Sequence, residues 1–194
     1  MRATLILSAL LLASAAASPL AAQVRSKKAA PKAAPAPAPA PEAPRKIDWD
    51  GEWTLVPSES TELGPAIQEH VKDLNFFLKK MWQKKLEKAC HSYPNLFILS
   101  GENMSITYGK ERPVVTPSAG GSNDWVRSDD EKFQASMVKE VGRFTQTLEG
   151  DGYKLSHTYS MRLDGNTIAM EVSYVNPKCP AGDFSYRLVF KRKG

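Results

Sequence analysis

Histidine and cysteine are scarce in this chain, whose 194 residues include three histidines and two cysteines. His70, His91 and His157 lie far apart in the sequence. The adjacent pair Cys90-His91 has the wrong spacing for two side chains to chelate one ion from a helix or a strand. The sequence therefore predicts no metal site and no cofactor.

Sequence motifs of common enzymes are also lacking: no nucleophile elbow, phosphate-binding loop or zinc-hydrolase motif occurs. The acidic residues Asp124, Asp129, Asp130 and Glu131 lack the glycine-punctuated pattern of a calcium loop, so we interpret them as a solvated loop. No carboxylate or nucleophile clearly shares the predicted face of His157, and a hydrogen-bonded core histidine explains it better than a catalytic base. The sequence predicts no catalytic residue and favours a role other than catalysis.

A charge excess is missing from the part of the chain that can fold. The whole chain has 26 Lys and Arg against 21 Asp and Glu, but seven of the basic residues and one acidic residue precede Ile47. From Ile47 onward, 19 basic residues face 20 acidic ones. A nucleic-acid-binding domain carries its positive charge on the fold, so we expect no nucleic-acid partner.

Residues 1–22 have the features of a secretory signal peptide. Basic Arg2 precedes an apolar run from Leu5 to Ala17, and small residues follow. Ala15-Ala16-Ala17 and Leu20-Ala21-Ala22 are alternative cleavage sites. The other interpretation, a transmembrane anchor, requires roughly 20 apolar residues. Neither cysteine lies near the cleavage region, which argues against a lipoprotein anchor.

Residues 23–46 form an Ala/Pro-rich linker. Alternating alanine and proline favours extended polyproline II, a semi-rigid spacer that rises about 3.1 Å per residue. A spacer between a surface and the folded part and a passive exported tail are both compatible with this composition. Leaders of this kind resemble those of envelope proteins of Gram-negative bacteria, so we expect a periplasmic protein.

Residues 47–194 are long enough for one domain, and a helical insert is predicted over about 63–90. Apolar residues recur there at intervals of three and four, on one helix or on two helices broken around Asp73-Asn75. The opposite face is basic and includes Lys79, Lys80, Lys84 and Lys88. Either this face is solvated, or it contacts an anionic membrane surface or the anionic head group of a ligand.

Apolar residues alternate with polar ones from Pro94 to the end of the chain. Gly150-Asp151-Gly152 and Asp164-Gly165-Asn166 are strong hairpin turns, because glycine and asparagine tolerate positive φ. Pro113 to Ser128 is interpreted as an edge strand and a long loop. The pattern predicts a mainly β fold, an antiparallel up-and-down β-barrel of 8–9 strands with the helical insert after the first strand.

The string Gly51-Glu52-Trp53, the strand meander and a cationic residue in the last strand together resemble the calycins, the superfamily of lipocalins and fatty-acid-binding proteins. Helices directly after the first strand are similar to the fatty-acid-binding arrangement, in which they cap the barrel mouth. The export signal is similar to that of bacterial lipocalin-like proteins. The resemblance implies that Arg192 packs across Trp53 on the barrel floor. It also implies a small apolar or amphipathic ligand inside the barrel.

Polar-tipped side chains occupy the predicted inward face and are the candidate ligand-binding residues. They are Tyr108, Gln146, Tyr153, His157, Tyr159, Tyr174 and Tyr186. These tips either orient an amphipathic guest or hydrogen-bond to one another. We therefore expect a small-molecule binding or carrier protein, and the alternative is an envelope module that contacts membrane or protein partners through its basic helix or tail.

Cys90 and Cys179 are the only cysteines. Because exported proteins form disulfides, we expect these two to pair and to fasten the helical insert to the barrel rim. The alternative is one buried and one exposed thiol.

Overall fold

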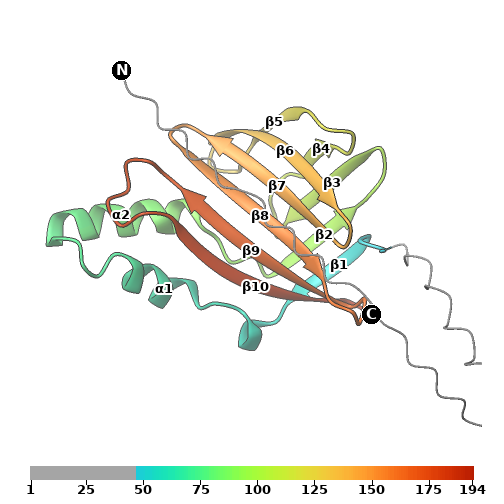
Figure 1. Cartoon of the computed structure of the whole chain (residues 1–194), viewed down its shortest axis with the longest axis horizontal. Helices are drawn as coiled ribbons and strands as arrows, with labels where there is room; N and C mark the ends of the chain where they lie inside the picture. The colour runs from blue at the N-terminus through green and yellow to red at the C-terminus, as the bar shows by residue number, and fades with distance from the viewer. Residues whose placement is uncertain (1–46) are drawn as a thin grey trace, which may run out of the picture. The chain divides into compact units, whose positions relative to one another are not determined.

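The computed structural model describes residues 47–194, and the predicted signal peptide and linker lie outside the described residues. Ten strands and two α-helices make up the fold (Figure 1). The strands are β1 (Gly51–Leu55), β2 (Asn95–Leu99), β3 (Asn103–Tyr108), β4 (Val114–Pro117), β5 (Ser122–Val126), β6 (Lys132–Glu140), β7 (Arg143–Gly150), β8 (Tyr153–Met161), β9 (Thr167–Val175) and β10 (Phe184–Arg192).

The ten strands form one antiparallel sheet in the order β4-β3-β2-β1-β10-β9-β8-β7-β6-β5. The sheet curls until its edge strands β4 and β5 approach each other, where the Asn123 side-chain amide donates to the Val115 carbonyl at 3.1 Å. No backbone ladder joins these two strands in the described part of the chain. The barrel is therefore nearly closed, which agrees with the predicted calycin-like architecture.

The predicted number of 8–9 strands is wrong, because the stretch interpreted as one edge strand and a loop contains both β4 and β5. β5 begins with three exposed polar residues, Ser122-Asn123-Asp124, and only Trp125 on this strand is buried. With a single buried apolar residue, the sequence of β5 shows no alternation of apolar and polar residues by which the strand could be predicted. The strand exists because it pairs with β6 from Ser122↔Ser136 to Val126↔Lys132.

Two helices follow β1, as predicted, after a short 3-10 turn (Pro57–Glu59): α1 (Leu63–His70) and α2 (Phe76–Ala89). The Asn75 side chain caps α2 by accepting a hydrogen bond from the Leu78 amide at 3.0 Å. Trp82 and Leu86 on α2 are buried against the barrel. No helix among the described residues is both long and apolar enough to cross a membrane.

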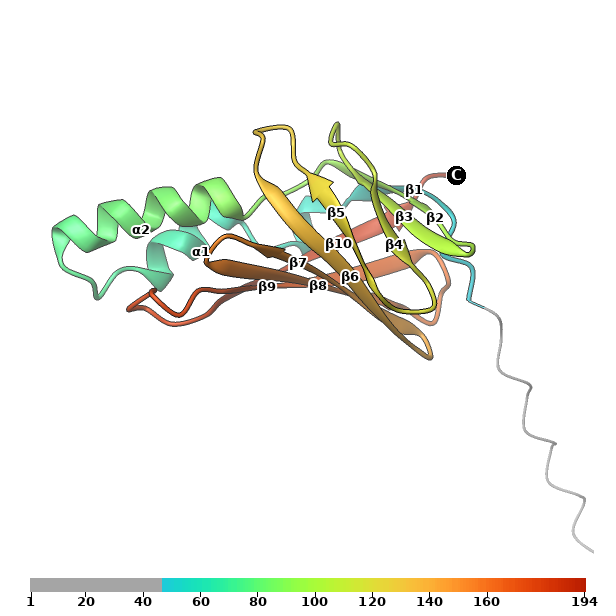
Figure 2. The same ribbon diagram turned by 90° about the horizontal axis from the view of Figure 1, so that it is seen from above.

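The helices lie at one end of the barrel, which we call the mouth (Figure 2). Side chains from α2, from the β5–β6 and β7–β8 turns and from the end of β9 line one cavity there. We call the opposite end the floor. It is formed by the start of β1, the end of β10 and the β8–β9 turn. A second cavity lies there, lined by Ile47 and Asp48 before β1, by the β8–β9 turn and by Arg192.

Trp53 and Arg192 close the floor. They are paired across β1 and β10, and the guanidinium lies 4.4 Å from the centre of the indole ring. Arg192 also donates to the carbonyls of Asp50 and, at 2.7 Å, Asp48. Gly51 has φ 127°, and a Cβ there would lie 3.2 Å from the guanidinium, so this position requires glycine. The predicted contact between Arg192 and Trp53 is confirmed.

Replacing the cation tests the role of this contact. We expect Arg192→Met to lower the free energy of unfolding in urea by about 1–3 kcal/mol, since it removes the cation–π contact and the hydrogen bonds. Arg187→Met on the same strand is the control: Arg187 is half exposed and pairs only with Glu171, so its loss should change stability by less than about 1 kcal/mol. Equal losses in the two variants would contradict this role.

Candidate ligand-binding site

The predicted site residues face the barrel interior. Six of the seven are buried, with exposed fractions of 0–4%. The seventh, Tyr153, is partly buried at the mouth. The structure gathers four of them into one group, Tyr108, Gln146, His157 and Tyr159, which we call the interior polar cluster.

The Tyr108 hydroxyl is the centre of the interior polar cluster. It contacts Gln146 Oε1, the Tyr159 hydroxyl and, at 2.9 Å, His157 Nδ1. A phenol has one proton to donate, and the amide oxygen of Gln146 can only accept, so Tyr108 donates to Gln146. The other two neighbours must then donate to Tyr108. This pattern places the proton of His157 on Nδ1 and leaves its Nε2 as an acceptor.

The interior polar cluster is uncharged at neutral pH. Burial, and next the nearby His91, lower the pKa of His157 to about 4. Burial also raises the pKa of Tyr108 and of Tyr159 well above the ordinary value. Each ring is therefore in its neutral form, as the pattern of donors and acceptors requires.

One polar atom of the interior polar cluster has no partner. Gln146 is 0% exposed, and its Nε2 makes no hydrogen bond although its Oε1 does. A buried donor without an acceptor costs about 1–3 kcal/mol. An acceptor brought into the interior would remove that cost.

Side chains fill the space around the interior polar cluster. Phe144 stacks on Tyr159 and is 1% exposed, and the partly buried Tyr93 packs on Tyr108 with 4.8 Å between the ring centres. Met137 is paired with Gln146 and Met170 with Tyr159 on the adjoining strands. Met104 is a third buried methionine of the same core. Methionine is unbranched and adapts its shape readily, so this packing can rearrange more easily than one of branched side chains.

The other three predicted residues lie at the mouth. Tyr174 packs on Tyr153, with 5.2 Å between the ring centres. The Tyr186 hydroxyl donates to the His91 carbonyl at 3.0 Å and accepts from the His91 amide at 3.2 Å, which fastens the chain directly after α2. These three therefore line or support the mouth and do not join the interior polar cluster.

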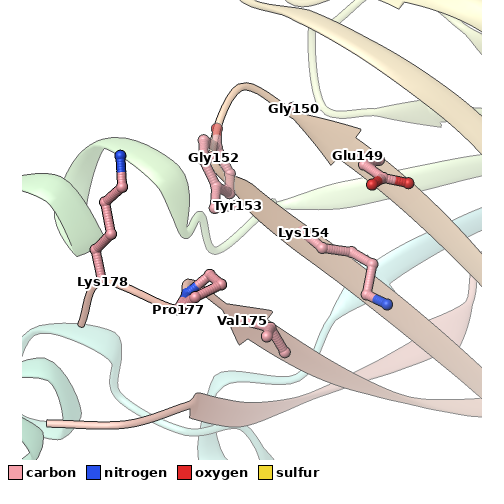
Figure 3. A pocket seen from close by; sticks show the side chains of 8 residues that line it. All are labelled: Glu149, Gly150, Gly152, Tyr153, Lys154, Val175, Pro177 and Lys178. Atoms are coloured by element: carbon pink, nitrogen blue, oxygen red, sulfur yellow. The ribbon is translucent and has the colours of Figure 1, made fainter. Parts of the chain in front are cut away.

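Two cavities flank Tyr153. One, of 190 Å³, is lined by Lys85, Lys88, Ala89, Glu131, Asp151, Tyr153, Tyr174 and Asn176. The other, of 330 Å³, lies beside the β7–β8 turn, with Glu149 and Lys154 on the strands and Lys178 on the β9–β10 connection (Figure 3). Both open at the surface of the mouth.

Arg127 holds the end of α2 against the barrel, and the sequence did not predict this role. It is 4% exposed, donates to Asp129 at 2.9 Å and to Glu131, and reaches the Lys88 carbonyl at 3.3 Å. The hydrogen bond from Arg127 lowers the pKa of Asp129 to about 2. Both acids lie in a loop, as predicted, and Asp129 is exposed, but both also pair with Arg127. An arginine two and four residues before them was the available signal for this pairing.

The predicted disulfide between Cys90 and Cys179 is not present, and both cysteines are buried free thiols. Cys90 ends α2 within the core, where burial raises the pKa of its thiol to about 12. The alternative of one exposed thiol also differs from the structure. Within residues 47–194, no group of three or more His, Cys, Asp or Glu side chains is placed to hold a metal ion.

No protein-family model and no curated protein matches this chain. Solved structures with a similar arrangement include the Echinococcus granulosus fatty-acid-binding protein 1, at 14% identity and TM-score 0.49, covering 75% of this chain and 98% of that one. Lipid binding protein 8 of Caenorhabditis elegans has 13% identity and TM-score 0.45, covering 74% and 94%. Human cRBP IV has 17% identity and TM-score 0.45, covering 76% and 100%. At these low values, the description of the site depends on the chain's own geometry.

The protonation of His157 can be measured. In an NMR titration of the histidine rings, we expect His157 to stay neutral until about pH 4, with its proton on Nδ1. Because the unfolded chain takes up this proton near pH 6.5, the free energy of unfolding should fall by up to about 3 kcal/mol between pH 6.5 and 4.

His157→Gln should remove most of that pH dependence. Burial, and next the charge of Arg127, also lower the pKa of His91, so His91→Gln is the matched control and should retain the part contributed by His157. A titration of His157 near its ordinary pKa would contradict the proposed proton arrangement.

Proposed function

We propose that this chain is a periplasmic protein that binds or carries a small amphipathic molecule in the interior of its barrel. The observation that supports the proposal best is the interior polar cluster, an uncharged hydrogen-bonding group with an unpaired donor inside an apolar barrel. Binding sites for small molecules combine apolar walls with a few polar groups that fix the orientation of the ligand. The barrel supplies both.

Binding requires the interior to open, because side chains now occupy it. Entry at the mouth would displace α2, which is held by the Arg127 contacts and by Tyr186. The three interior methionines can then move aside at a smaller packing cost than branched residues. The ligand's apolar part would replace contacts among these side chains, and its polar end would meet the interior polar cluster.

Native mass spectrometry of the protein purified from the periplasmic fraction should show a bound small molecule. After extraction of that molecule, the neutral dye Nile red should bind with one-to-one saturation and a blue-shifted emission. Ala135 is inward and fully buried on β6, so Ala135→Phe should fill the interior further and weaken dye binding about tenfold or more.

Val138→Phe provides the matched control on the same strand. Val138 is 66% exposed, so this variant should bind the dye like the unmodified chain. Circular dichroism would establish that both variants are folded. The proposed function would be refuted if the protein purified from the periplasmic fraction carried no bound molecule and also failed to bind Nile red.

A second candidate function is contact with the envelope membrane through α2. Its first two residues, Phe76 and Phe77, are 83% and 76% exposed. Lys80, Lys84 and Lys88 are exposed along the same helix, while Lys79 is half-buried. Exposed aromatic rings beside lysines favour the surface of a bilayer that contains anionic lipids.

Sedimentation with phosphatidylcholine vesicles, with and without phosphatidylglycerol, tests this second candidate. We expect binding only with the anionic lipid, and Phe76→Ser combined with Phe77→Ser should weaken it by about tenfold. Leu163→Ser is the control, because Leu163 is fully exposed at the floor. Vesicle binding that is unchanged by the phenylalanine substitutions would exclude this role for α2.

A further inference from the structure

We infer that the ligand places an uncharged hydrogen-bond acceptor, such as a hydroxyl or a carbonyl oxygen, against the interior polar cluster, and that a carboxylate is not accepted there. This inference rests on the proposed binding function and narrows its ligand class. Two features of the barrel interior, within residues 47–194, support the inference: the positions of its charged side chains and the unpaired amide of Gln146.

An anion in the interior would find no available cation. Arg127 is the one buried basic residue between 47 and 194, and two carboxylates, Asp129 and Glu131, already neutralise it at the mouth. Arg192 lies at the floor on Trp53, where backbone carbonyls occupy its guanidinium. Removing a carboxylate from water without a partner of opposite charge is strongly unfavourable.

A neutral acceptor, in contrast, would find a donor that has no partner. The side-chain amide of Gln146 is fully buried and its Nε2 is unpaired. Gln146 and His157 are directly paired across β7 and β8, so both side chains lie on the inner face next to each other. The amide can donate a hydrogen bond to the ligand's oxygen, and Nε2 of His157 can accept a hydrogen bond from a ligand hydroxyl.

The mouth contains an alternative binding site for an anionic group. Lys85 and Lys88 line the 190 Å³ cavity, and a ligand inserted tail first could leave a carboxylate beside them. Lys88 already lies 3.8 Å from Asp129 and 3.9 Å from Glu131. The Tyr153 hydroxyl in the same cavity is also buried without a hydrogen-bond partner. We favour the interior site because Gln146 is fully buried, whereas Tyr153 is partly exposed at the mouth.

Displacement of Nile red by three ligands of equal chain length tests the inference: dodecanol, dodecanamide and dodecanoate at pH 8. We expect the alcohol and the amide to displace the dye at concentrations about tenfold or more below that of the carboxylate. Gln146→Leu should reduce the affinity for the two neutral ligands by about tenfold, since it removes the donor. Thr147→Val, the adjacent outward-facing position, should leave all three affinities unchanged.

The outcomes separate this inference from the proposed function. Equal or tighter binding of dodecanoate would overturn the inference and leave the proposed function in place. If Lys85→Gln combined with Lys88→Gln abolished that dodecanoate binding, the polar end would lie at the mouth, which also overturns the inference. Failure of the dye and of all three ligands to bind would overturn the proposed function itself. Unchanged dodecanol affinity in a folded Gln146→Leu variant would remove Gln146 from the site.

Discussion

A polar atom that faces the inside of this barrel can find a hydrogen-bond partner only inside the barrel. The strands turn one face inward along their whole length, and the side chains on that face are almost fully buried. Apolar residues meet this condition by packing, but Tyr108, Gln146, His157 and Tyr159 can meet it only by bonding to one another. A single phenol proton then determines which atoms donate. The result is a neutral, polar centre in an apolar interior, with one amide donor left over.

The two ends of the barrel have different physical roles. At the floor, the Arg192 guanidinium packs on the Trp53 ring, and the backbone at Gly51 lies close against the same guanidinium. At the mouth, the end of α2 is held by hydrogen bonds from Arg127 and Tyr186, and cavities open to the surface. Hydrogen bonds near solvent exchange with water more readily than buried packing rearranges. The proposed ligand would therefore enter at the mouth, while the floor contributes to stability.

The sequence was sufficient wherever a local repeat determines the structure. The period of two identified the inward face, and the resemblance to the calycins identified Arg192 as the partner of Trp53. β5 was missed because three polar residues precede its only buried side chain. The contacts of Tyr108 join residues 38 to 51 positions apart, across the barrel, and no local pattern encodes them. Arg127 was missed because its burial depends on Lys88, 39 residues earlier.

The central claim is that the unpaired amide of Gln146 contacts the ligand. The most direct measurement is the NMR signal of the Gln146 side-chain NH₂ group during a titration with dodecanol. The claim predicts a large, saturable shift of this signal. The signals of Phe76 and Phe77, at the far end of α2, should be the same in the ligand-saturated and the ligand-free protein. A Gln146 signal that stays unchanged while the ligand saturates the protein would contradict it.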